Sequence, residues 1–500
     1  MARIVMLVAN PGSMDARVCK EAEALVAAGH EVTVGCRLMP GYSQREVING
    51  VTFRRFDLFA PRAFDKPTLD RVFKAFGPLA DETRQKFELW TAAALAAEKA
   101  EAKYAEAQRA REIHSSSREV AVRLRTVREQ RAPVVLAWRE TNTATRFFIQ
   151  HALFACHLME LADEAPHVVH AHDVYMAPAG VALGRYIGAR VIYDAHEIET
   201  ERVPPLPPDR KAFVAAIEQA VAPHLDGMIV VCGSAAKFYR EMIGVEACVV
   251  MNAPDLAEIE GPDIRTMLPP LDGPLIVYTG GVGLETRGLQ HVVPVLKELG
   301  AHLAILGPRN ASDVWLFDLA DALGVRDRLH PLPPVPQAQV VCAIRSADVA
   351  VCPIQDVSLS YRYSMPNKLF EAAFAGVPIC VSNLPEMSAF VRRLKVGEVM
   401  DQTNPDDIAR TIRKVLSNRK AYETSPTAKR LLETEYAWPN QASRLVEFYD
   451  LVLSGSSFSK TSRSSLAKPN LSWASIKRAW SSAFSVLKRS SSRASSMRDF

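Results

Sequence analysis

The sequence predicts an α/β protein made of two Rossmann-like, doubly wound domains in tandem, with a cleft between them. Three observations support this fold class. The chain has 500 residues, which is too many for one hydrophobic core. Near its start, short apolar runs alternate with helical patterns, and such alternation builds parallel sheets. A second series of the same kind begins at Pro274.

The first domain is expected to cover 1–256. Residues 3–9 form an apolar run typical of a strand that is buried on both faces. Residues 15–28 have helical periodicity, Gly29 provides a stop, and 31–36 form the next strand. These elements make a βαβ unit.

The same domain continues with further strands and helices after a gap. HVVHAHD is typical of a strand end with a polar tip, and 177–187 is expected to be helical. ARVIYD (189–194) and GMIVVC (227–232) are the next strands. Ser234 then stands where a helix N-cap is expected.

The gap itself, about 62–150, is predicted to be a helical insertion within the first domain. It is rich in Ala, Glu, Lys, Arg and Gln, and WTAAALAAEKAEAKYAEAQRAREI is a strong helix former. The stretch has no glycine-rich loop and no metal-ligand spacing. We expect a structural or oligomerising helix hairpin.

The second domain is expected to cover 264–430. Its strands are PLIVYTGG, HLAILG, DVAVCP and VPICVS, and its helices are predicted at 289–299, 367–375 and 406–416. In doubly wound sheets, ligands bind beyond the carboxyl ends of the strands. The cleft between the two domains is therefore the expected site.

Composition excludes several classes of protein. No apolar run approaches the ~20 residues that span a bilayer. The eight cysteines form no CxxC pair, so a zinc framework is not expected. We expect free thiols in a reducing cytosol instead. The net charge of +4 is modest, and we predict no nucleic-acid partner.

The tail, 455–500, has a different character. It is rich in Ser and carries nine Lys or Arg against one acidic residue. Within 472–489, five large apolar side chains recur at three- and four-residue steps beside basic residues: Trp473, Ile476, Trp480, Phe484 and Leu487. This pattern predicts an amphipathic helix on an anionic membrane surface. The alternative is a simply disordered tail.

Several segments together resemble a known family. DARVCKEAEALVAAGHEVTV, VVHAHD, ARVIYDAHE, VYTGGVGLETRGL, SADVAVCP and PNKLFEAAFAGVPICVS stand in the order and spacing of the retaining glycosyltransferases of the GT-B fold, family 4. The NKLFE wording is similar to one subgroup. EYAWPNQASRLVEFYDLVL resembles the family's final helix, so 431–454 is expected to cross back to the first domain.

The resemblance implies a nucleotide-sugar donor, of UDP or GDP type, bound by the second domain. Glu371 would accept hydrogen bonds from the ribose hydroxyls, and Arg287 would contact phosphate. The Gly280-Gly281 turn would let phosphate approach the backbone. The remaining donor-binding residues implied are Asn367, Lys368 and Leu369. Otherwise Glu371 is a helix N-terminal acid and Arg287 a surface charge.

The chain departs from the family pattern at two places. The family carries a basic residue where Gly281 stands, and Lys368 is our candidate replacement. It also carries a second Glu eight residues before Glu371, where this chain has Tyr363. The departure at Tyr363 leaves the sugar contacts open.

The first domain supplies the acceptor side of the cleft. His172 is implied to face the reacting sugar, and we name it with Arg287 and Lys368 as the catalytic candidates. A hydrogen-bonded structural histidine is the alternative. The other cleft candidates are Gly12, Arg17, Asp173, His196 and Glu197, with Tyr363 from the second domain. Arg17 could instead be a solvated helix charge, and His196 and Glu197 could cap the following helix.

The function implied is transfer of a sugar from a nucleoside-diphosphate donor to a saccharide or lipid-linked acceptor in cell-surface polysaccharide or glycoconjugate synthesis. The donor's own phosphate oxygen would take the acceptor proton, so catalysis would be positioning and electrostatics. No cofactor and no metal are expected. We expect a cytoplasmic protein, peripheral on the inner face of the membrane. Two other classes remain open: a degenerate scaffold or partner subunit, and a sugar-nucleotide epimerase.

Overall fold

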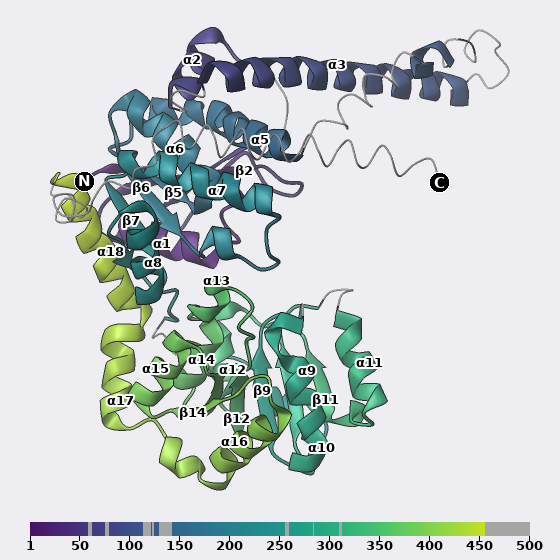
Figure 1. The fold of residues 1–500 in the computed structure, drawn as a ribbon, viewed down its shortest axis with the longest axis vertical. Coiled ribbons are helices and arrows are strands. Elements are labelled where there is room, and N and C mark those ends of the chain that lie inside the picture. The colour runs from purple at the N-terminus through teal and green to yellow at the C-terminus, as the bar shows by residue number, and fades with distance from the viewer. Residues whose placement is uncertain are drawn as a thin grey trace.

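The computed structural model describes residues 1–58, 63–75, 80–113, 122, 125–129, 143–255, 260–283, 285–309 and 313–455. They form two α/β units, one above the other in Figure 1, which are linked along one side by the last two helices, α17 and α18. Each unit is built around its own sheet. The predicted fold class, two doubly wound domains with a helical insertion in the first, is confirmed.

The first unit has an eight-stranded sheet in the order β3-β4-β2-β1-β5-β6-β7-β8. Neighbouring strands are parallel except β3 and β4. The strand order reverses direction at β1, which lies between β2 and β5, and ligand sites form beyond such reversals. The strands are β1 (Arg3–Leu7), β2 (Glu31–Arg37), β3 (Arg45–Ile48), β4 (Val51–Phe56), β5 (Val168–His172), β6 (Arg190–Ala195), β7 (Gly227–Val230) and β8 (Cys248–Val249).

Helices that follow the strands in the chain cover this sheet. α1 (Ala16–Ala27) follows β1 and begins after Asp15, whose carboxylate accepts from two backbone N–H groups of the first turn. α6 (Asp173–Ile187) follows β5, and α7 (Pro208–Val221) and α8 (Gly233–Ile243) follow β6 and β7. α6 begins at Asp173, directly at the strand end and earlier than the predicted 177.

The helical insertion lies between β4 and β5. Its helices are α2 (Lys66–Ala75), α3 (Ala80–Ile113) and α5 (Thr143–Leu158), followed by a 3-10 turn at Met159–Glu164. α2 and α5 pack on α6, and Phe73 and Phe87 join the core of the first unit. Figure 1 shows α3 as an arm that extends beyond the rest of the unit. The insertion therefore combines a packed base with an extended arm.

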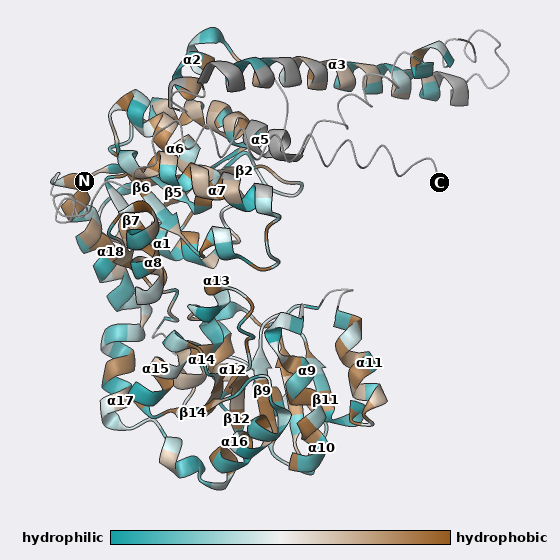
Figure 2. Ribbon diagram, in the orientation of Figure 1, coloured by the Kyte–Doolittle hydropathy of each residue, from teal (hydrophilic) through white to brown (hydrophobic). Residues whose placement is uncertain are grey.

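The second unit has a six-stranded, all-parallel sheet in the order β11-β10-β9-β12-β13-β14. Its strand order reverses between β9 and β12. In Figure 2 these inner strands are brown, whereas the helices around them carry both brown and teal. The strands are β9 (Leu275–Thr279), β10 (His302–Leu306), β11 (Leu329–Leu332), β12 (Val349–Cys352), β13 (Ile379–Ser382) and β14 (Gly397–Met400).

The helices of the second unit alternate with these strands. They are α9 (Leu289–Val292), α10 (Leu296–Leu299), α11 (Val314–Ala322), α12 (Val340–Ile344), α13 (Leu359–Arg362), α14 (Asn367–Phe374), α15 (Pro385–Leu394) and α16 (Pro405–Ser417). The single helix expected at 289–299 is wrong. A 3-10 turn at Val293–Val295 separates α9 from α10, because Pro294 has no N–H to continue the helical ladder.

The last described helices return to the first unit. α17 (Pro426–Leu431) belongs with the second unit, and α18 (Trp438–Leu453) packs on the first sheet. Phe448 approaches the backbone of Gly227 so closely that a Cβ there would stand 2.4 Å from its ring. Among the described residues, no helix is both long and apolar enough to cross a membrane. The predicted amphipathic helix at 472–489 lies outside the described residues.

Another correction concerns the start of α8. Ser234 was the expected N-cap, but Cys232 holds that position, with its sulfur accepting from the Ala235 N–H. The N–H of Ser234 donates instead to Glu386 Oε1 of α15, at 2.8 Å. A carboxylate from the second unit thus satisfies the helix N-terminus of the first.

Candidate functional site

The two units meet through α13 and the loops around it. Ser360 Oγ in α13 donates to Glu197 Oε2 at 3.4 Å. Cys232 Sγ donates to the backbone oxygen of Tyr363 at 3.0 Å. The side chain of Tyr363 packs against the core of the first unit. Tyr363 and Glu197, both predicted from the sequence, therefore lie at the junction between the units.

Glu371 in α14 is the central carboxylate of the second unit. Its side chain is only 4% exposed. Thr279 Oγ1, at the end of β9, donates to Oε2 at 2.7 Å, and Gln337 Nε2 donates to Oε1 at 2.6 Å. Burial raises the pKa of Glu371, although these hydrogen bonds and the charge of Lys368 oppose the shift. The two donors hold the carboxylate in one orientation.

Lys368 lies against the glycine turn that follows β9. Its ammonium is 4.0 Å from the ring centroid of Tyr278, and 3.5 Å from where a Cβ on Gly280 would stand. Gly280 has φ +106, a backbone conformation that side chains rarely adopt. Among the described residues, no atom stands within 4 Å of where a Cβ on Gly281 would lie, its chain neighbours aside. A cation thus stands beside a turn whose backbone is accessible to a ligand.

Arg287 lies on the same side of the sheet. It ends the 3-10 turn Glu285–Arg287, and its guanidinium is 5.3 Å from the ring centroid of Tyr361 in α13. The positive charges of Arg287 and Lys368 both act on Cys352 at the end of β12, although burial dominates and raises the pKa of that thiol to about 11. The two predicted cations therefore converge on the β9/β12 switch point.

Two further residues of the predicted donor set differ in their surroundings. Asn367 is the first residue of α14 and is half-buried. Leu369 is fully buried in the hydrophobic core, and its N–H donates to the Pro366 carbonyl. Its selection as a donor contact is therefore corrected: Leu369 supports α14 from beneath.

Arg17 in α1 is buried, neither a cleft side chain nor a solvated charge. Its Nε and Nη2 donate to the two oxygens of Asp194 at 2.9 and 2.8 Å, and Nη1 donates to the Val250 carbonyl. Burial lowers the pKa of Arg17, but Asp194 and Glu21 outweigh it and the net shift is upward. Arg17 orients Asp194, which the sequence analysis did not select.

His172 and His196 lie side by side on Asp194. His172 Nδ1 is 3.1 Å and His196 Nε2 is 3.0 Å from Asp194 Oδ2. His172 is fully buried, whereas the His196 side chain is 19% exposed, so His196 is the more exposed imidazole at this edge of the sheet. Burial lowers the pKa of His196, yet Asp173 and Asp194 raise it to about 9 overall. Asp173 and Asp194 therefore favour the protonated form of His196.

Asp173 and Gly12 have left-handed backbones for different reasons. Asp173 has φ +59 at the junction of β5 and α6, where its carboxylate lies 3.6 Å from His196 Nδ1. Strain of this kind is often found at functional sites. Gly12 has φ +80, and a Cβ there would stand 3.0–3.1 Å from Phe53 and Cys36. Core packing therefore explains Gly12, and its proposed approach to a ligand is not needed.

A second pair of carboxylates lies beside His196. Glu197 and Glu199 each have a pKa raised by burial, Glu199 to about 7 despite its 2.6 Å contact with Arg202. The sequence analysis missed Glu199 and Arg202. Their ETER motif carries no glycine or histidine signal that would have singled them out.

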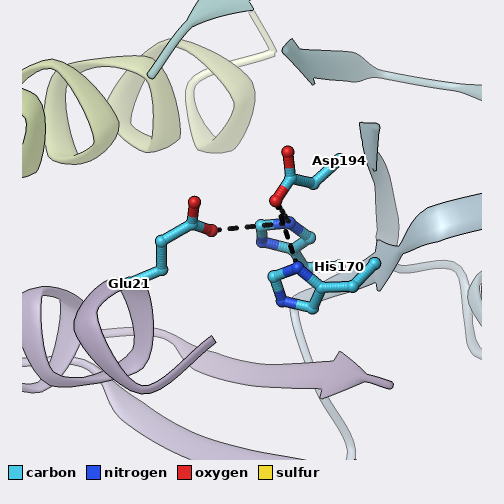
Figure 3. A group of neighbouring side chains, drawn as sticks. Glu21, His170 and Asp194 are labelled. Atoms are coloured by element: carbon cyan, nitrogen blue, oxygen red, sulfur yellow. Dashed lines mark hydrogen bonds and ion pairs between the residues drawn. The ribbon is translucent and has the colours of Figure 1, made fainter. Parts of the chain in front are cut away.

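A four-residue cluster lies below these groups. Glu21 from α1, His170 and His172 from β5, and Asp194 from β6 have potential ligand atoms that all lie within 4.8 Å of one another. Figure 3 shows Glu21 reaching from its helix toward His170 and Asp194. His170 and His172 alternate along β5 and share one face of the strand, and the two carboxylates join them from α1 and β6.

Family models of known proteins match residues in both units. The family model "Glycosyl transferases group 1" matches residues 264–431, and "Glycosyl transferase 4-like domain" matches 89–253. A glycogen synthase of Mycobacterium tuberculosis is 23% identical over 351 residues, which are 67% of this chain and 82% of that protein.

Two solved structures share the architecture across most of the chain. Sucrose-phosphate synthase of Thermosynechococcus elongatus matches with a TM-score of 0.63 and 13% identity, over 91% of this chain and all of that one. Anabaena HepE in complex with UDP matches with a TM-score of 0.57 and 11% identity, over 90% and 100%. The chain has the GT-B fold.

Within this GT-B protein, the second unit corresponds to the group 1 match and contains Glu371, Lys368 and Arg287. The first unit contains the Asp194 cluster. Sequence reasoning missed Thr279 and Gln337, the two donors to Glu371. Thr279 directly precedes the recognised glycine turn, so its position at the strand end was a usable signal. Gln337 lies in a proline-rich loop without a motif.

Proposed function

We propose that this protein is a retaining glycosyltransferase that moves a sugar from a nucleoside-diphosphate donor to a saccharide or lipid-linked acceptor. The observation that carries the proposal is the buried Glu371 beside the Lys368 ammonium and the Gly280 turn. A carboxylate, a cation and an accessible backbone at one switch point are what ribose and diphosphate require. Group 1 and 4-like family matches support transfer chemistry.

Glu371 accepts hydrogen bonds from the ribose hydroxyls in this proposal. Thr279 restricts the carboxylate to one orientation, which lowers the entropy cost of binding, and Gln337 occupies Oε1 until a ribose hydroxyl replaces it. Lys368 and Arg287 neutralise the diphosphate as the bond to the sugar breaks. The departing charge develops at the same place where both cations converge. HepE in complex with UDP supports, by analogy, a UDP-type donor.

The acceptor binds on the side of the first unit. The donor's phosphate oxygen takes the proton of the acceptor hydroxyl, and the acceptor oxygen forms its bond on the face that the diphosphate leaves, so configuration is retained. His196, which lies 3.6 Å from Asp173 and 3.0 Å from Asp194, is at this edge beside the acceptor. His172 beneath it positions His196 through their 3.0 Å contact.

The test is a transfer assay on the full chain with UDP- and GDP-linked sugars. Release of nucleoside diphosphate is expected from one donor class, and proton NMR of the product should show the donor's anomeric configuration. An inverted product would refute the retaining mechanism. Interconversion of the donor sugar without transfer would indicate an epimerase.

A degenerate scaffold is the second candidate function. The observation that favours it is Gly281. Among the described residues, no atom beyond its chain neighbours would meet a Cβ there within 4 Å, so packing does not explain why the family's basic residue is missing. A chain that binds no nucleotide, and whose α3 arm binds a partner protein, would support the scaffold.

The cellular place of the reaction is part of the proposal. We infer a cytoplasmic enzyme that binds the inner face of the membrane through 472–489, where a lipid-linked acceptor would be available. Co-sedimentation with anionic vesicles should be lost when 456–500 are removed. Equal sedimentation of the truncated and full chains would contradict this placement.

A further inference from the structure

The cluster of Glu21, His170, His172 and Asp194 lies within the first unit, separate from the donor-side residues. All four side chains are fully buried. They come from three elements, α1, β5 and β6, that are far apart in the chain. Polar groups without exposure to water need partners inside the protein, or they cost free energy.

Those partners are missing for part of the cluster. Among the described residues, neither oxygen of Glu21 has a hydrogen-bond partner, although Oε1 forms an ion pair with Arg17, and His170 Nε2 and His172 Nε2 have no partner either. The other nitrogen of His170 is 2.7 Å from Tyr449 Oη in α18. If His170 donates to Tyr449, its Nε2 presents a lone pair to Glu21. Histidines that bind metals commonly donate their second ring N–H in this way.

The distances fit one shared ion. His170 Nε2 is 3.9 Å from Glu21 Oε2 and 3.9 Å from Asp194 Oδ2. These separations are too long for direct hydrogen bonds, which end near 3.2 Å. Metal bonds of about 2.0–2.4 Å place neighbouring ligand atoms roughly 3–4 Å apart. Figure 3 shows the carboxylates of Glu21 and Asp194 both directed at the histidine rings between β5 and α1.

Arg17 contacts both carboxylates of the cluster. Its Nη2 lies 3.1 Å from Glu21 Oε1 and 2.8 Å from Asp194 Oδ1. Arg17 approaches Glu21 through Oε1, which leaves Oε2 directed at His170. A hydrogen bond from Arg17 to a ligating carboxylate would fix its orientation, as supporting groups around metal sites do.

We propose that Glu21, His170 and Asp194, with His172 beside them, bind one divalent transition-metal ion such as Zn²⁺. Imidazole and carboxylate ligands suit this class of ion. The ion ties α1 to the central strands and, through His170 and Tyr449, to α18. The role of the ion is structural: it holds Asp194 and His172, which contact His196. The proposal therefore does not depend on the proposed transfer reaction.

The test measures metal in the purified, untagged full chain. Elemental analysis should find about one transition-metal ion per chain, and Co²⁺ reconstitution should give a visible absorption band. Both signals should be lost in Glu21→Gln and in His170→Gln. The matched control is His302→Gln, which removes another buried histidine that contacts an aspartate, Asp272, on the second sheet.

A second measurement uses only the wild-type chain and therefore remains decisive if the variants fail to fold. The wild-type chain is refolded with a strong chelator and then with added Zn²⁺, and its melting temperature is recorded. A rise of several degrees with Zn²⁺ supports the site. The absence of metal, of a Co²⁺ band and of any Zn²⁺-dependent rise would overturn it. Wild-type metal content in a folded Glu21→Gln would equally exclude Glu21 as a ligand.

Discussion

The side-chain amide of Gln337 donates a 2.6 Å hydrogen bond to Oε1 of Glu371. The proposed ribose hydroxyls would donate to the same carboxylate. Gln337 therefore stands where the donor substrate must make its own contact, and nucleotide binding should change this hydrogen bond.

Gln337→Ala tests that exchange. The substitution leaves a buried carboxylate oxygen without its donor, so the free energy of unfolding should fall by about 1–2 kcal/mol. The bound nucleoside diphosphate should then stabilise the variant more than the wild type, because a ribose hydroxyl replaces the lost donor. Thermal melts with and without nucleotide measure both effects. Gln339→Ala, which removes an exposed amide two residues later, is the control. A smaller nucleotide effect in Gln337→Ala would speak against exchange.

Lys368 and Arg287 should act on phosphate and not on the nucleoside. Replacing either by Met should weaken binding of the nucleoside diphosphate about 10- to 100-fold, the loss of one charge-assisted contact of about 1.5–3 kcal/mol. Binding of the nucleoside alone should change little. Calorimetric titration of both ligands measures the difference. Lys429→Met, on the exposed side of α17, should match the wild type. Equal losses for nucleoside and diphosphate would contradict the assignment.

Gly281→Lys is a gain-of-function prediction. Of the residues that the structure describes, none but the chain neighbours has an atom within 4 Å of the Cβ position, so a Cβ fits there, and the lysine ammonium would add to the charge of Lys368. Diphosphate binding should tighten several-fold, with a steeper dependence on salt. If affinity falls while the melting temperature is unchanged, then the glycine is required for the approach of the ligand itself.

Glu218 should make stability depend on pH. It is buried between Tyr193 and Tyr239, which both donate to Oε1 at 3.0 Å, and burial raises its pKa from 4.5 to about 7. Because the folded state favours the protonated form, the stability contribution is intact below pH 4.5 and is lost as pH rises to about 7. The loss is on the order of 3 kcal/mol at most.

Glu218→Gln isolates this effect because the amide resembles the protonated acid. The difference in unfolding free energy between variant and wild type, measured by urea titration, should grow from pH 4.5 to 7 and then level off. The surface substitution Glu435→Gln should show no such growth. A difference that is constant with pH would mean that Glu218 stays ionised in the fold.

The features that could be predicted from the sequence are those set by short local patterns of residues. The strands and the glycine turn carry their own periodicity or turn signal, and Glu371 stands in a recognisable neighbourhood. Arg17 was misjudged because its partner Asp194 is 177 residues away, and an exposed and a buried helix arginine look alike in the sequence. Leu369 was predicted as a donor contact because it stands between Lys368 and Glu371 in the motif, although its apolar side chain belongs to the core. The break at Pro294 was readable from the proline alone.

Calorimetric titration of UDP and GDP into the wild type, Glu371→Gln and Glu435→Gln tests the central claim most directly. The account predicts that one nucleotide binds the wild type and Glu435→Gln equally, and binds Glu371→Gln at least about tenfold more weakly, because an amide is a poorer acceptor for two hydroxyls. Equal binding by Glu371→Gln, or no binding by the wild type, would contradict it.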